Sequence, residues 1–451
     1  MASAAEQMAA NMSWGSFGKA KDLRQRIFFA IGLLIVYRIG TYIPIPGVDP
    51  LQLAAFFEDQ QGGIGGILNM FTGGAISRMA IFTLGIMPYI SASIIVQLLT
   101  SMVPSLENLK KEGEQGRKKI NQYTRYGTVA LALAQSYGMA VGLEGQGLAT
   151  DPGMFFRAST VITLVGGTMF LMWLGEQITA RGIGNGISLI IFVGIVAGLP
   201  AATAQFFAAG RSGAISTPLI LGVMVMVVVV LGLVVFVERA LRKIHIQYPK
   251  RQVGMKMYGG ESSHLPVKLN PSGVIPAIFA SSLLLLPTTV TAFSDQGGTG
   301  IMATIAAYMG RGQPLYMILT AALVVFFAYF YTHNVAFKVD DVADNLKKQG
   351  GFVPGIRPGA KTADYLEYVM NRLLVLGGAY LAAVVLLPEL LIAKTSIPFY
   401  FGGTSVLIVV SVTMDTINQV QSHMLAQQYE SLIEKSKMRG KNRSKARRGR
   451  K

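Results

Sequence analysis

The chain has no cysteine and little charge. None of its 451 residues is cysteine, so disulfides, thiolate nucleophiles and cysteine-ligated zinc are excluded. Only 14% of the residues are charged and 51% are hydrophobic, whereas an ordinary soluble domain carries about 25% charged residues. The composition therefore indicates a membrane protein.

Sequence patterns for catalysis are also missing. The four histidines do not cluster, and neither HExxH nor the phosphate-binding GxxxxGK[ST] pattern occurs. Gly182, Gly184 and Gly186 imitate part of a dinucleotide loop, but predicted membrane helices flank them, so we expect a tight turn with close helix packing. A catalytic triad whose residues are distant in the sequence and meet only in the folded chain stays an alternative. We expect no enzyme, no cofactor and no metal site.

What the chain does have is long apolar runs. A membrane helix needs about 20 predominantly apolar residues, and the chain offers ten candidate segments, of which the first contains Arg38 and the ninth is short and must include flanking residues. This arginine either faces the protein interior or extends outward to the membrane surface. The predicted spans are 27–45, 79–106, 126–143, 158–175, 182–210, 212–237, 269–294, 312–337, 373–388 and 395–414.

Basic residues fall on one side of this topology. If the N-terminus lies inside the cell, the cytoplasmic segments are the N-terminal arm, the loops that follow spans 2, 4, 6 and 8, and the tail. These segments hold 34 of the 40 Lys and Arg residues. Cytoplasmic loops retain positive charge, so both termini are predicted to be cytoplasmic. Ten spans divide into five plus five, and this count alone suggests an inverted repeat.

The predicted organisation follows from these spans. Two cytoplasmic loops, 238–268 and 338–372, mix basic residues with aromatics and turn residues, which favours protruding hairpins that dock a partner over simple charged connectors. We expect the tail to be disordered and attracted to lipid or nucleic acid. The predicted units are a cytoplasmic arm (1–26), an N-terminal half (27–203), a hinge loop (204–216), a C-terminal half (217–418) and a basic tail (419–451).

A glycine-rich half-segment precedes the second span. Residues 61–72 are uncharged, too short to cross a bilayer, and contain Gly62, Gly63, Gly65 and Gly66. Irregular backbone at membrane depth survives only when it is buried in protein or lines a watery cavity. This stretch is therefore predicted to line or close a hole through the membrane.

Several long motifs resemble one family. The motifs are IPIPG (43–47), LGIMPYISASI (84–94), KKEGEQGRKKINQYTRYGT (110–128), FLMWLGEQIT and RGIGNGIS (170–188), GVIPAIFASS (273–282), DNLKKQGGFVPGIRPG (344–359) and PFYFGGTS (398–405). Through these motifs the chain resembles, over nearly its whole length, the SecY family, whose members are the channel subunits of the bacterial protein-secretion translocon.

The resemblance implies an all-α fold of ten transmembrane helices in two pseudo-symmetric five-helix halves around an hourglass pore. Its waist is a ring of aliphatic side chains, which resists leakage by excluding water and hydrated ions. The matching pore-ring positions are all isoleucine, namely Ile86, Ile90, Ile187, Ile191, Ile278 and Ile408. The matching plug residues are Gly63, Ile64, Gly65, Gly66, Ile67, Leu68, Asn69, Met70 and Phe71.

The family also opens sideways, through a lateral gate between helices 2/3 and 7/8, to release membrane segments into lipid. Small or weakly polar residues there let the halves close without too strong an apolar contact, and the two prolines are expected to kink their helices. The gate residues are Pro88, Ser91, Ser93, Gln97, Pro276, Ser281 and Ser282.

The partners implied by the resemblance supply the energy that a passive channel lacks. They are SecE and SecG in a heterotrimer, the motor ATPase SecA, the ribosome, preprotein signal sequences and anionic lipids, all at the bacterial inner membrane. The docking positions for SecA or the ribosome are Lys250, Arg251, Arg357 and Tyr429. A secondary transporter with an inverted repeat, or a lipid-embedded scaffold without a conduit, are the alternatives.

Overall fold

The chain forms a mostly helical bundle. The structure is a computed structural model that describes residues 21–49, 52–53, 69, 72–213, 216–249, 251–253, 256–258, 262–294, 313–395 and 402–448. Its helices are α3 (Lys21–Gly40), α6 (Met87–Met102), α7 (Pro104–Lys111), α8 (Glu114–Gly145), α9 (Met154–Arg181), α10 (Gly186–Arg211), α11 (Thr217–Arg239), α12 (Ile275–Ser294), α14 (Pro314–Tyr331), the π-helix η1 (Thr332–Ala336), α15 (Val339–Gln349), α16 (Ala360–Thr395) and α17 (Gly403–Arg448).

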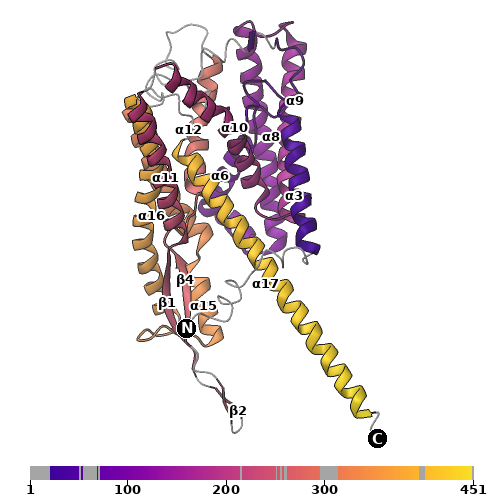
Figure 1. Cartoon of the computed structure of the whole chain (residues 1–451), viewed down its shortest axis with the longest axis vertical. Coiled ribbons are helices and arrows are strands. Elements are labelled where there is room, and N and C mark those ends of the chain that lie inside the picture. Colours follow the sequence, from indigo (N-terminus) through magenta and orange to yellow (C-terminus); the bar gives the residue numbers. More distant parts are fainter. Residues whose placement is uncertain are drawn as a thin grey trace.

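The helices fall into two groups that meet along two lines. One group consists of α3, α6, α8, α9 and α10, and the other of α11, α12, α14, α16 and α17. On the right of Figure 1, α3, α8 and α9 stand together, and α11 and α16 stand on the left. Along the first line, α12 contacts both α6 and α8; we call this contact the seam. Along the second line, α17 packs against α10 and α3. The two groups are therefore joined along both lines by helices that are far apart in the sequence.

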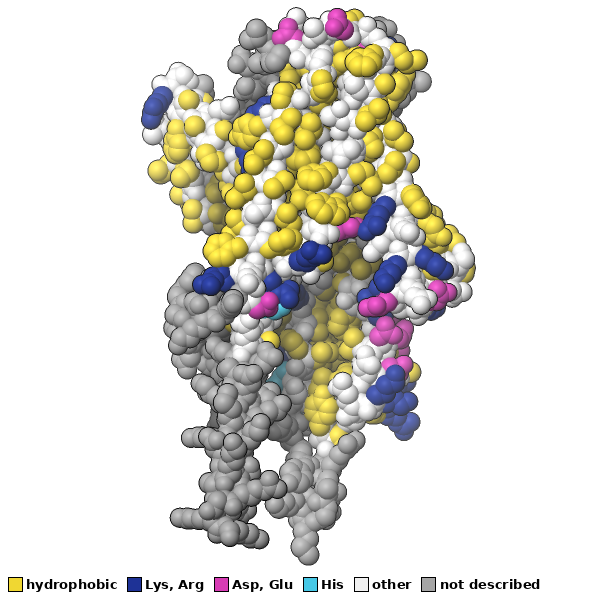
Figure 2. Space-filling view, turned by 90° about the vertical axis from the view of Figure 1, so that its right-hand side faces the viewer, with side chains coloured by type: hydrophobic (Ala, Val, Ile, Leu, Met, Phe, Trp, Pro, Cys, Tyr) yellow, Lys and Arg dark blue, Asp and Glu magenta, His cyan; other side chains and the backbone are white. Residues whose placement is uncertain are grey.

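Apolar side chains cover the bundle where a membrane would surround it. Figure 2 shows hydrophobic side chains over the upper part of one face and charged side chains gathered below them. Within the described residues, five helices are long and apolar enough to cross a membrane, or up to six if the bent pair α6 and α7 counts as one span. The chain is thus a multi-pass membrane protein, and the count of ten spans stays a prediction.

The loop at 238–268 forms the predicted hairpin. Strands β1 (Leu241–Gln247) and β4 (Ser262–Lys268) pair antiparallel, and β2 (Arg251–Val253) pairs with β3 (Lys256–Tyr258) beyond them. Ile244 and Ile246 are buried on one face of β1, as the period of two residues requires. We call the end of the bundle where β1 and β4 lie the hairpin end (Figure 1).

The loop at 338–372 is not a hairpin, so that prediction is wrong. It folds into α15 and a turn that pairs with β1, where Gln247 and Phe352 exchange backbone hydrogen bonds of 2.9 and 3.0 Å. Apolar residues recur with helical spacing, two aspartates lie in the first turn, two lysines lie in the last turn, and Gly350 ends the helix at φ 75°. The segment therefore begins as a helix, and the turn residues that had suggested a hairpin form the turn after that helix.

Two other predictions, for the hinge loop and for the tail, differ from the structure. The predicted hinge 204–216 is mostly helix, because α10 continues to Arg211. The predicted disorder of the tail is wrong for its backbone, because α17 continues to Arg448. Both segments are rich in good helix formers such as Ala, Lys and Arg, which prolong a helix past its apolar part.

The second predicted span begins later than expected. Residues 79–86 form turns, and they are joined to the end of the first span by Ile45 N–H to Met79 O at 2.8 Å and Ile81 N–H to Ile43 O at 2.9 Å. Helix α6 starts at Met87, and α7 follows it after a bend of 98°. Pro88 and Pro276 lie in the first turns of α6 and α12, where a missing N–H costs nothing, so the expected kinks are absent.

Candidate functional site

The six predicted pore-ring isoleucines come together in one hydrophobic cluster. Ile86, Ile90, Ile191, Ile278 and Ile408 are at most 7% exposed, and the half-buried Ile187 packs against them. All six lie in, or directly before, the first two turns of α6, α10, α12 and α17. Four helix beginnings therefore contribute these aliphatic side chains to the same hydrophobic core, which also contains many other residues of the bundle.

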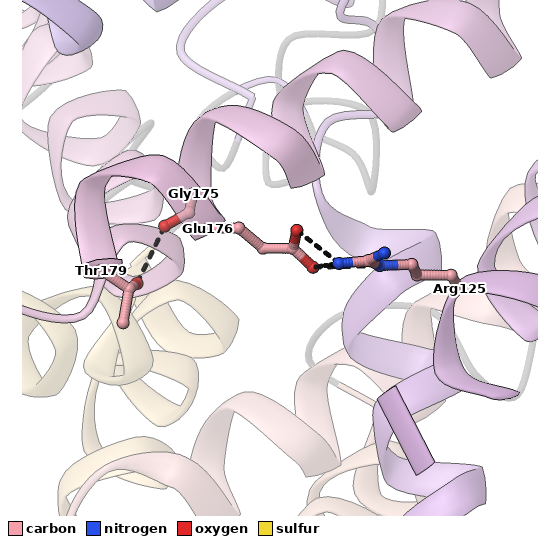
Figure 3. A network of polar contacts seen from close by, with 4 residues as sticks. All are labelled: Arg125, Gly175, Glu176 and Thr179. Atoms are coloured by element: carbon pink, nitrogen blue, oxygen red, sulfur yellow. Dashed lines mark hydrogen bonds and ion pairs between the residues drawn. The ribbon is translucent and has the colours of Figure 1, made fainter. Parts of the chain in front are cut away.

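The turn between α9 and α10 fixes two of these isoleucines. Gly186 opens α10 so close to the Gly175 carbonyl that a Cβ atom at this position would collide with it. The Thr179 hydroxyl accepts a hydrogen bond from Gly186 N–H at 2.9 Å. The same hydroxyl donates one to Gly175 O at 2.8 Å, which Figure 3 shows. Close helix packing thus accounts for these glycines, as expected, and it sets the position of Ile187 and Ile191.

An ion pair and a contact from α17 hold the same turn. The Arg125 guanidinium of α8 donates to both carboxylate oxygens of Glu176 at 2.8–3.2 Å (Figure 3). On the other side, Gly184 N–H donates to the Gln419 side-chain oxygen at 2.8 Å. Elements from both groups of helices therefore position the start of α10.

Asn185 caps α10, and its loss has a measurable cost. Its side-chain oxygen accepts from Ile187 N–H at 3.1 Å and Ser188 N–H at 3.5 Å. We expect Asn185→Ala to destabilise the protein by about 1 kcal/mol, because the first turn loses this acceptor. The measurement is thermal unfolding in detergent micelles by circular dichroism. Asn185→Asp keeps the acceptor and serves as control; equal unfolding midpoints for both variants would contradict the role of the cap.

A polar cluster positions α12 and its Ile278. The Asn270 amide donates to Glu238 at 3.0 Å and to Gly273 O at 3.0 Å, while its oxygen accepts from the Ser272 hydroxyl at 2.8 Å. Asn270 is buried between the end of β4 and the start of α12. The hairpin and this pore-ring helix are therefore held in a fixed relation.

The predicted gate residues lie on the helices that form the seam. Pro88, Ser91, Ser93 and Gln97 are on α6, and Pro276, Ser281 and Ser282 are on α12. The Ser282 hydroxyl faces the Met87 sulfur at 3.7 Å across the seam. Ser91 Oγ and Gln97 Oε1 are buried and have no hydrogen-bond partner among the described residues. Helix α6, which packs against both α12 and α8, thus carries buried polar atoms without a hydrogen-bond partner among the described residues.

Arg38 faces the protein interior, which decides between the two predicted orientations. Its guanidinium donates to Gly73 O at 2.6 Å and to the Tyr42 hydroxyl at 3.2 Å. The adjacent buried Tyr37 donates to Thr72 O at 3.3 Å. These hydrogen bonds offset the free-energy cost of placing a charge inside the membrane protein. They also fix the backbone that follows the predicted plug. No pattern in the sequence pairs these distant residues.

Some predicted site residues lie beyond what can be described. Of the plug residues, Asn69 alone is described; its side-chain oxygen accepts from Ser77 N–H at 3.0 Å, and the others, with Lys250, lie outside the described residues. Arg251 belongs to β2 and Tyr429 to the backbone of α17. Arg357 is exposed in the turn between α15 and α16. The pore-ring and gate residues thus share α6 and α12, while Arg251, Arg357 and Tyr429 belong to other elements.

Three comparisons relate this arrangement to known proteins. A family model described as SecY matches residues 80–417. The chain is 54% identical to "Protein translocase subunit SecY" of Escherichia coli (strain K12) over 429 residues, covering 94% of this chain and 96% of that protein.

Solved structures support the fold. One, described as "The plug domain of the SecY protein stablizes the closed state of the translocation channel and maintains a membrane seal", matches with a TM-score of 0.64 at 19% identity, covering 89% of this chain and 92% of that one. Another, "Sec61 in the Canine ribosome-channel complex from the endoplasmic reticulum", matches with a TM-score of 0.59 at 18% identity, covering 89% and 92%. At these identities the likeness shows the fold alone.

Proposed function

The chain belongs to the SecY family, and from this premise we propose how it conducts polypeptides. It is the pore-forming subunit of a protein translocase, a channel and not an enzyme. The observation that supports the mechanism is that the beginnings of four helices contribute all six isoleucines to one hydrophobic core inside the bundle. We propose that these side chains surround an unfolded preprotein as it crosses the membrane.

The chemistry of isoleucine suits this task. An aliphatic constriction gives water and hydrated ions no hydrogen bonds, so it resists leakage when the pore is empty. The same side chains offer no charge or hydrogen bond that would hold a passing polypeptide. The proposed waist therefore seals the membrane and lets the substrate move.

Residues 63–71 are proposed to be the plug on the outer side of this waist. A plug domain that stabilises the closed state is described for the SecY protein whose structure the fold resembles. In this chain, Tyr37 and Arg38 bind the carbonyl groups of Thr72 and Gly73, directly after the proposed plug. These hydrogen bonds give the segment a fixed point of attachment to α3.

The seam is proposed to be the lateral gate. A signal sequence gains about 25 cal/mol per Å² of apolar surface when it leaves the channel for lipid. The buried Ser91 and Gln97 oxygens have no hydrogen-bond partner among the described residues, so a movement of α6 that lets water or a new partner reach them would be favoured. Membrane segments would leave through this line, between the helices of predicted spans 2/3 and 7/8.

We propose the bacterial inner membrane as the location, with both termini and the hairpin end in the cytoplasm. The concentration of Lys and Arg in the corresponding loops supports this orientation, and anionic lipid headgroups would contact the basic N-terminal arm. SecE and SecG would complete the heterotrimer. The motor SecA or a ribosome would dock at the hairpin end; the matched Sec61 structure is a ribosome–channel complex.

Reconstitution tests this function. Proteoliposomes that contain this chain with SecE, SecG and SecA are expected to protect a preprotein from added protease when ATP is present. Liposomes that lack only this chain are the control. Equal protection in both would contradict a role as the conduit.

Arg357 provides a test of the docking surface. We expect Arg357→Glu to slow SecA-driven export by about tenfold or more, because reversing an exposed charge puts like charges opposite each other at an acidic partner. Lys361→Glu, an equal charge reversal at an exposed residue four positions further along the chain, in the first turn of α16, is the matched control. The rate of preprotein import into proteoliposomes is measured for both. A normal rate with Arg357→Glu would show that the docking assignment is wrong.

A further inference from the structure

One charged side chain crosses the seam at the hairpin end. The Lys110 ammonium, at the end of α7, donates to the backbone carbonyl of Asn334 at 3.1 Å. Helix α7 continues from α6 after the sharp bend, whereas Asn334 lies in η1, which continues α14. The contact therefore joins the two sides of the seam beyond the point where α6 and α12 meet.

The acceptor is suited to a cation. Asn334 lies in a single π-helical turn, where Phe337 N–H bonds Thr332 O at 3.0 Å and the Asn334 amide donates back to Phe330 O at 3.0 Å. Carbonyl groups in the last turn of a helix lack intrahelical donors and carry the negative end of the helix dipole. An isolated π turn is also a common mark of functional segments.

Both ends of this contact are firmly held. The His333 ring contacts the Asn371 side-chain oxygen at 3.0 Å, which ties η1 to α16. On the other side, Gly116 packs α8 against the Leu109 carbonyl so closely that no Cβ atom would fit. Because the backbone on both sides is held, parting of the seam at this end by more than the Lys110 side chain can span requires that its hydrogen bond to Asn334 breaks.

The surroundings of Lys110 increase the dependence of its ammonium on the Asn334 carbonyl. The side chain is half-buried, and burial, with the nearby Lys338 and Arg117 cations, lowers its pKa below the ordinary value for lysine. Glu107 acts in the opposite direction. An ammonium placed among cations and partly removed from water is stabilised by the Asn334 carbonyl, and parting of the seam would remove this acceptor.

We propose that Lys110 is a specificity-determining residue for substrate entry: its bond to Asn334 latches the hairpin end of the seam, so that only a sufficiently apolar signal segment opens it. The proposal rests on the seam being the lateral gate. A latch differs from a general stabilising contact in its expected effect. Weakening the latch increases export of preproteins with a weakly apolar signal segment and leaves export with a strongly apolar one unchanged.

Three variants separate the latch from its surroundings. Lys110→Met keeps the apolar stem and removes the donor, and Lys110→Arg keeps a donor. Lys111→Met removes the adjacent lysine, which is exposed and paired with Glu107 at 2.8 Å. Since the chain has no cysteine, spin labels on Asn108→Cys and Val335→Cys report the width of the seam by pulsed electron resonance without background labelling.

The expected result has two parts. Lys110→Met broadens the spin-label distance distribution toward longer values, and it raises export of a preprotein with alanine-substituted, weakly apolar signal by about tenfold, because a lost charge-assisted hydrogen bond shifts an opening equilibrium by that order. Lys110→Arg and Lys111→Met behave like the unaltered chain. Export with an intact signal stays the same in all four proteins.

Either part failing overturns the proposal. An unchanged distance distribution would show that Lys110 does not hold the seam, and an unchanged preference between the two signals would show that it does not set specificity. If the unaltered chain exports neither preprotein, the proposed function has failed, and the distance measurement still decides whether the latch exists.

Discussion

Replacing Ile86, Ile191 and Ile278 together by serine raises the ion conductance of the resting channel by about tenfold or more, since a tenfold rise needs only about 1.4 kcal/mol less barrier. All three side chains are at most 7% exposed and come from different helices. Three hydroxyl groups give water hydrogen bonds inside a constriction that otherwise excludes it. Conductance is measured with the purified translocase in planar bilayers.

The control removes isoleucines that the bundle does not enclose. Ile162 on α9 and Ile318 on α14 are 72% and 68% exposed, so serine there faces the membrane. We expect that pair of substitutions to leave conductance unchanged. If the ring variant conducts no more than this control, the isoleucine cluster is ordinary core and not the barrier to ions.

Gly167→Ala is expected to destabilise the protein by about 1–3 kcal/mol, because it forces overpacking at a rigid contact. Gly167 is buried in α9 directly against the backbone carbonyl of Ile81, and a Cβ atom has no room there. Ile81 belongs to the turns at 79–86 that lead into Ile86 and α6. Displacing these turns also disturbs the waist, so a lower unfolding midpoint is expected together with raised conductance.

The neighbouring glycine supplies a matched control. Gly166 lies in the same helix, is exposed, and has nothing within 4 Å of its would-be Cβ atom. Gly166→Ala is expected to stabilise the helix by roughly 0.5–1 kcal/mol, since alanine loses less entropy. Thermal unfolding of both variants in detergent micelles gives opposite shifts. Shifts of the same sign would contradict the packing of α9 against Ile81.

Much of the fold follows from local patterns along the chain. The low charge, the apolar runs and the long motifs predicted a helical membrane protein of the SecY family, which is confirmed. The hairpin at 238–268 is also confirmed. The wrong predictions arose where one local signal was given too much weight. Pro88 and Pro276 indicated kinks but begin helices, and the turn residues near Phe352 hid the helical pattern of α15.

The candidate site was harder to predict where distant residues meet. Asn185 before an apolar run is a recognisable helix cap, so its role was open to sequence reasoning. The bonds from Arg38 to Gly73 and from Lys110 to Asn334 were not, because they join residues 35 and 224 positions apart through backbone carbonyls. A carbonyl is present at every residue, so no side-chain pattern identifies it as a partner.

The most direct test of a polypeptide path through the isoleucine cluster is crosslinking. A secretory precursor is stalled in the translocase, and a photo-reactive amino acid is placed in turn at Ile86, Ile90, Ile187, Ile191, Ile278 and Ile408, with Ile318 as the outward-facing control. Adducts with the precursor at all six positions and none at Ile318 are predicted. Adducts at Ile318 but not at the six would show that the substrate takes another route.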